Sequence, residues 1–160
     1  MSHRPVAGAL VLFLAACGAS GVPGNYTKGA CGAVDAGARS LDHLAAAVIA
    51  LDAGDADALG AEVEAARIDA HVVSGQISYM PRNWGPGDAT RNVLVEEVHA
   101  PLDAARALLP DPRAGPVAEV PPLEARERAE LDALMRRARA GLETARASLA
   151  DELGVDCTAT

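Results

Sequence analysis

The chain has 160 residues and a formal net charge of −8; half of its residues are hydrophobic, but only 2% are aromatic. The acidic balance excludes broad binding to nucleic acid, which depends on clustered positive charge. All-β folds depend on aromatic and β-branched residues, whereas the Ala, Leu, Arg and Glu that dominate here favour helices, so the composition predicts an all-α protein.

The first 16 residues have the pattern of an export signal. His3 and Arg4 precede an apolar run that starts near Val6 and closes on small residues. The run is too short to cross a bilayer as a permanent helix, which needs about 20 apolar residues. We therefore expect residues 1–16 to be a signal peptide and not part of the fold.

The sequence Leu14-Ala15-Ala16-Cys17 resembles the lipobox of bacterial lipoproteins. The resemblance implies that Cys17 carries acyl chains such as palmitate, becomes the mature N-terminus and anchors the protein to a membrane outside the cytoplasm. The residue after Cys17 is Gly18 and not Asp, so the chain lacks what resembles an inner-membrane retention signal. That points to the outer membrane in a Gram-negative cell, and to the outer face of the plasma membrane in a Gram-positive one.

Residues 17–30 are rich in Gly, Ala and Ser and predict a flexible tether, so residues 31–160 would form the folded domain. Lipid on Cys17 leaves Cys31 and Cys157 as a single pair. Exported proteins fold in an oxidising compartment, so we expect a Cys31–Cys157 disulfide. The alternative is two free and unrelated thiols.

Apolar periodicity predicts four helices. The first ends at Gly54, and Asp55 can cap the second. Pro101 lies inside the third helix and should kink or divide it, and a proline-rich connector, 110–121, follows. The predicted helices are 34–53, 56–78, 89–109 and 122–153.

These helices favour an up-down-up-down four-helix bundle. In that order the start of the first helix and the end of the last lie at the same end, which is where Cys31 and Cys157 fall. The cleanest apolar stripe belongs to the second helix and consists of Leu59, Val63, Ala66, Ala70, Val73 and Ile77.

The connector 79–87 after the second helix is the first candidate site. Trp and Arg are frequent anchors of binding interfaces, and Gly and Pro would hold the connector in a defined turn. It could recognise a partner or small ligand, or its aromatic residues could simply cap the end of the bundle. The candidate residues are Tyr79, Arg82, Asn83 and Trp84.

Three histidines form the second candidate site. His43, His71 and His99 fall one each on the first three helices and at one level along the bundle axis, so they could bind zinc or copper. Glu96, three residues before His99, could add a carboxylate. The helical angle, however, places all three on the flanks of their apolar stripes, and the alternative is three unconnected surface histidines.

A small basic cluster on the last helix is the third candidate. Acidic residues surround it in sequence, which favours a solvated, ion-paired helix face over a phosphate or lipid-headgroup site. The cluster consists of Arg136, Arg137 and Arg139.

The sequence has no nucleophile elbow, phosphate-binding loop, dinucleotide fingerprint or His-Glu-x-x-His motif. We therefore expect a binding or structural role at the cell envelope, without enzymatic activity and without a cofactor. The membrane, through the lipid, and an envelope protein would be its partners. The alternative is a metal-binding lipoprotein that uses the three histidines.

Overall fold

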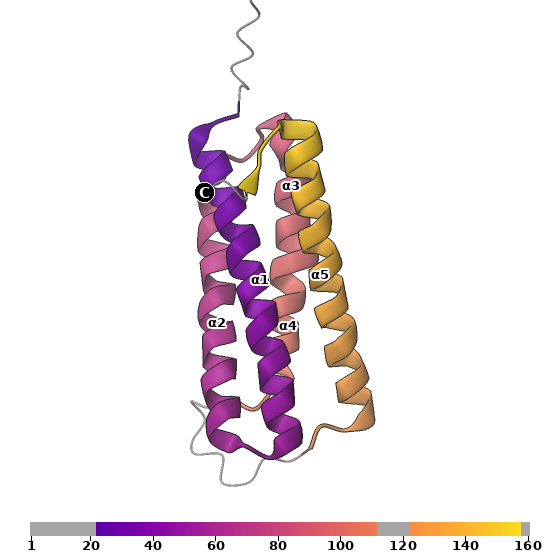
Figure 1. Ribbon diagram of the computed structural model, residues 1–160. Helices are drawn as coiled ribbons and strands as arrows, with labels where there is room; N and C mark the ends of the chain where they lie inside the picture. The colour runs from indigo at the N-terminus through magenta and orange to yellow at the C-terminus, as the bar shows by residue number, and fades with distance from the viewer. Residues whose placement is uncertain (1–21, 112–121, 158–160) are drawn as a thin grey trace, which may run out of the picture.

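The computed structural model describes residues 22–111 and 122–157 (Figure 1). Within these residues the regular structure consists of four long helices and no strand, so the predicted all-α fold is confirmed. None of the helices described is both long enough and apolar enough to span a membrane. The helices are α1 (Gly24–Ala53), α2 (Ala56–Tyr79), a third formed by α3 (Asp88–Val93), a π-helical segment (Leu94–His99) and α4 (Ala100–Ala107), and α5 (Ala125–Leu153).

The apolar stripes of the four helices meet in one core. The whole predicted stripe of α2 is buried, from Leu59 to Ile77. In the third helix Leu94, Val98 and Leu102 are at most 1% exposed. Helical periodicity therefore identified the faces that pack together.

The connection between α1 and α2 is as short as expected. Gly54 ends α1 in the left-handed conformation, with φ of 69°, and its N–H bonds to the carbonyl of Ala50. The side chain of Asp55 then accepts a hydrogen bond from the backbone N–H of Ala58 at 3.0 Å. Both roles follow from residue type, since glycine adopts positive φ without strain and aspartate satisfies a free helical N–H.

The start of α1 was wrongly predicted. The helix begins at Gly24, ten residues before the expected Val34, and its first turns bury Tyr26, Ala30 and Cys31. Residues 24–30 are therefore helical and packed, not a flexible tether. The predicted signal peptide, 1–16, and the part of the predicted tether up to residue 21 lie outside the described residues.

Pro101 does not divide the third helix in two, since helical structure runs without a break from Asp88 to Ala107. The turn immediately before it widens into the π-helical segment Leu94–His99, and the helix continues through α4. A proline ring clashes with the carbonyl four residues earlier, here that of Glu97, and a π-turn moves this carbonyl out of the way. Gly141 of α5 packs on the widened turn, where a Cβ would lie 2.5 Å from the Glu97 carbonyl oxygen.

The last helix begins at Ala125, three residues after the expected Pro122. Glu124 and Glu127 form a reciprocal capping box at its start, which fixes the boundary. It ends at Leu153, followed by Gly154 in the left-handed conformation, as predicted. Of the connector 110–121, only Pro110 and Asp111 are described, and they have no regular structure.

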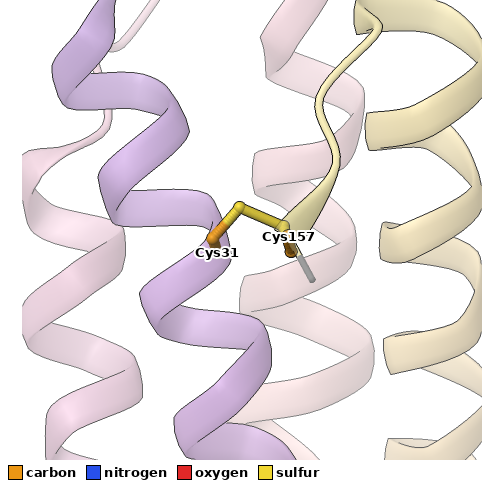
Figure 2. Close-up of a disulfide and its surroundings, with 2 residues drawn as sticks. All are labelled: Cys31 and Cys157. Carbon is orange, nitrogen blue, oxygen red and sulfur yellow. A yellow bond between two sulfur atoms is a disulfide. The ribbon is translucent and has the colours of Figure 1, made fainter. Parts of the chain in front are cut away.

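A disulfide joins α1 to the segment after α5 (Figure 2). The Cα atoms of Cys31 and Cys157 are 5.1 Å apart and the two residues are separated by 126 positions in sequence. Cys31 lies about two turns inside α1, since that helix starts earlier than expected. The disulfide therefore ties two distant parts of the chain together within the packed body of the domain.

Candidate functional site

One end of the molecule carries the predicted connector, together with the start of α1. α2 ends at Tyr79, and the chain turns through Asn83 and Gly85, both at positive φ (59° and 58°), before the third helix begins. A short 3₁₀ turn, Gly85–Gly87, leads into α3. The connector is thus a defined turn, as its Gly and Pro content indicated.

Trp84 caps the bundle rather than standing free. Its ring packs against that of Tyr26, with centroids 4.7 Å apart and planes at 52°. Gly87 lies against both rings, since a Cβ there would come within 2.3 Å of Trp84 and 2.4 Å of Tyr26. Trp84 therefore caps the end of the bundle. The ring that it packs against, Tyr26, comes from the segment that was predicted to be a flexible tether.

Tyr26 is the centre of this cap. It is fully buried, and its hydroxyl donates a hydrogen bond to the carbonyl of Gly87 at 3.0 Å. Burial raises the pKa of the Tyr26 phenol above its ordinary value of 10.0. The Thr90 hydroxyl lowers that pKa, while the carboxylates of Asp88 and Glu152 raise it further.

Tyr79 behaves differently from Trp84. It is 68% exposed and lines a cavity of about 370 Å³ between the start of α1 and the end of α2. Arg82 and Asn83 are also exposed, on the turn that follows. The other residues that line the cavity are Asn25, Lys28, Gly29 and Gln76.

This arrangement leaves Tyr79, Arg82 and Asn83 available for recognition. We call these three residues and the cavity, taken together, the Tyr79 end. Sequence reasoning missed Asn25 and Lys28, because both were placed in the tether. The Asn25 amide donates to the Tyr79 carbonyl at 3.4 Å, which links the start of α1 to the end of α2.

The three histidines do not form one site. His43 lies on the α1–α2 flank, where Nδ1 is 2.7 Å from Glu62 and Nε2 is 3.7 Å from Asp69. His71 and His99 line a separate cavity between α2 and the third helix. Within residues 22–111 and 122–157, no three His, Cys, Asp or Glu side chains are grouped so as to hold a metal ion. The exposed Glu96 accordingly completes no such group.

The basic cluster of α5 is partly an ion-paired face. Arg137 bonds to Glu97 of the π-helical segment through Nε and Nη2, at 2.6 and 2.9 Å, and this pairing lowers the pKa of Glu97. Arg139 lines a groove between α1 and α5 together with Asp42 and Glu143. Arg136 is exposed to solvent.

Comparison of this chain with family models, with curated proteins and with solved structures found no match.

Proposed function

We propose that this protein is a lipid-anchored component of a bacterial cell envelope with a binding or structural role and no catalytic activity. In this proposal Cys17 carries the lipid after residues 1–16 are removed, and the Tyr79 end contacts an envelope partner. The observation that carries the binding role is the large exposed Tyr79 beside a cavity, next to an aromatic cap that fixes the turn.

The proposal includes the up-down-up-down order of the helices. Contacts between α1 and α2 run in opposite directions along the two helices, since Arg39 meets Asp69 whereas His43 meets Glu62. At the far end, Arg128 near the start of α5 pairs with Asp52 near the end of α1. The disulfide joins the early part of α1 to the chain after α5. These contacts support antiparallel α1–α2 and α1–α5 pairs, as that order requires.

The anchor and the Tyr79 end belong to the same end of the molecule. Only seven residue steps separate Cys17 from Gly24, where α1 begins. Even a fully extended chain of that length spans no more than about 25 Å. A lipid on Cys17 would therefore hold the Tyr79 end close to the membrane, and the partner would itself be a membrane-associated protein.

The three-histidine metal site is not retained as a second candidate, since His43 lies on a different face from His71 and His99.

Site-specific photo-crosslinking in the producing bacterium tests the binding role. A photoreactive phenylalanine analogue at Tyr79 should yield a covalent adduct with a discrete envelope protein. The same analogue at Ile49 is the matched control, because Ile49 is 70% exposed and lies near the opposite end of α1. Adducts of equal yield at both positions, or at Ile49 alone, would contradict a binding role for the Tyr79 end.

A further inference from the structure

The segments that surround the Tyr79 end contain cations but no carboxylate. Residues 22–34 and 70–87 include no Asp or Glu, although the chain has 22 acidic residues among its 160. The same segments contain Lys28 and Arg82, and both side chains are exposed. Even with His71 neutral, these segments are therefore positive by two charges in a chain whose net charge is −8.

Lys28 and Arg82 are not paired with carboxylates. The ion pairs within residues 22–111 and 122–157 use other basic side chains, namely Arg39, His43, Arg67, Arg106, Arg128 and Arg137. Nor does either cation donate a hydrogen bond to this part of the chain. Both therefore keep their hydrogen-bond donors for a ligand, three on the ammonium and five on the guanidinium.

The carboxylates that flank these two segments in sequence interact elsewhere. Asp35 lines the cavity beside the disulfide. Asp69 pairs with Arg39 at 2.9 Å. Asp88, like Glu152, acts on the buried phenol of Tyr26. None of these carboxylates lines the cavity of the Tyr79 end.

That cavity presents several hydrogen-bond donors beside Lys28. Gly29 allows α1 and α2 to approach closely here, since a Cβ at Gly29 would lie 2.8 Å from the carbonyl oxygen of Gln76. The approach brings Asn25 and Lys28 of α1 to the same cavity as Gln76 and Tyr79 of α2. One ammonium group, two amides and a phenol hydroxyl therefore line it, and each of them can donate to an anion.

We propose that this cavity binds a carboxylate side chain from an acidic segment of the membrane-associated partner protein. The inference rests on the proposed function and adds the chemistry of the partner. Lys28 pairs with the carboxylate, and the amides of Asn25 and Gln76 donate to it. The ring of Tyr79 covers the aliphatic part of the bound side chain. Arg82, on the neighbouring turn, attracts the other acidic residues of the segment.

A lipid surface fits the same charges less well. Segments that bind anionic headgroups carry clusters of about four to eight basic residues, whereas the Tyr79 end has two. The net charge of −8 also repels the rest of the chain from an anionic surface. A cavity of about 370 Å³ suits one protruding side chain better than a flat array of headgroups.

Charge reversal combined with photo-crosslinking in the producing bacterium tests this inference. With the photoreactive analogue at Tyr79, Lys28→Glu together with Arg82→Glu should lower the yield of the protein adduct at least ~10-fold, because like charges then face each other. Arg126→Glu together with Arg136→Glu is the matched control. It makes the same change in net charge at two exposed positions of α5, and it should crosslink as the parent does.

The outcomes separate the inference from the proposed function. A parental adduct yield in the Lys28 and Arg82 double variant would overturn the acidic partner and leave the proposed function intact. Absence of any adduct in the parent would overturn both. Mass spectrometry of the adduct should identify a partner peptide that contains Asp or Glu. An adduct with a phospholipid or with a second copy of this chain would overturn the inference.

A defined acidic peptide tests the cavity itself. In NMR titrations of the full chain in detergent micelles, at fixed pH and ionic strength, hexaglutamate should shift the side-chain amide resonances of Asn25 and Gln76 saturably. Hexalysine should shift neither. Lys28→Gln should weaken the binding of hexaglutamate by about threefold, the effect of one exposed ion pair, whereas Arg126→Gln should leave it unchanged. Absence of a saturable shift with hexaglutamate, or equal shifts with both peptides, would overturn the site.

Discussion

Replacement of both Cys31 and Cys157 with serine is expected to lower the free energy of unfolding by about 4–5 kcal/mol. The disulfide closes a loop of 126 sequence positions, and a cross-link over so long a loop strongly reduces the conformational entropy of the unfolded chain. Typical domains are stable by only about 5–15 kcal/mol, so the variant should lose a large share of its stability.

Urea denaturation followed by circular dichroism measures this loss. Both proteins should carry Cys17→Ser, so that no third thiol interferes. The dependence of the unfolding free energy on urea should steepen in the double variant, because its unfolded chain exposes more surface. The parent treated with a strong reductant is the control and should behave as the double variant does. A reduced parent that unfolds at the same urea concentration as the oxidised one would contradict the expectation.

Tyr26→Ala is expected to destabilise the domain by about 3–5 kcal/mol. The side chain is fully buried, packs on Trp84 and bonds to the Gly87 carbonyl, so its removal leaves a cavity and releases the cap. Trp84 is the single tryptophan of the chain, and its fluorescence reports directly on this place. The emission should move to longer wavelength in Tyr26→Ala even before the domain unfolds.

Tyr26→Phe is the matched control, since it keeps the ring and removes only the hydroxyl. It should cost about 1 kcal/mol and leave Trp84 emission nearly unchanged. Since burial raises the pKa of Tyr26 above 10.0, the unfolded state ionises first as pH rises past 10. The contribution of the neutral phenol is therefore complete below pH 10 and is lost above it, so parental stability should fall more steeply there than that of Tyr26→Phe. Equal stabilities of Tyr26→Ala and Tyr26→Phe would show that the ring does not hold the cap.

Local patterns in the sequence predicted most of the helical architecture. Three features depend on residues that are close together in sequence, and the structure contains all three: the buried stripe of α2, the cap at Asp55 and the end of α5 at Gly154. The start of α1 could not be found in this way. Its Gly- and Ala-rich turns are held by the burial of Tyr26 against Trp84, which lies far along the chain.

The same limit applies to the candidate sites. The three histidines were grouped because they lie at the same level along the bundle axis. Contact also depends on the direction in which each side chain faces, and only His71 and His99 line the same cavity. The π-helical segment could not be foreseen, since Pro101 shows where a helix is disturbed but not how the chain accommodates it.

Mass spectrometry of the N-terminal peptide, from protein purified out of bacterial membranes, tests the lipid anchor most directly. The proposed function predicts a peptide that begins at Cys17 and carries a diacylglyceryl group with palmitate-type chains. Cys17→Ser should retain residues 1–16 and lose the lipid mass. An unmodified Cys17, or a membrane-bound parent that still carries residues 1–16, would contradict the proposal.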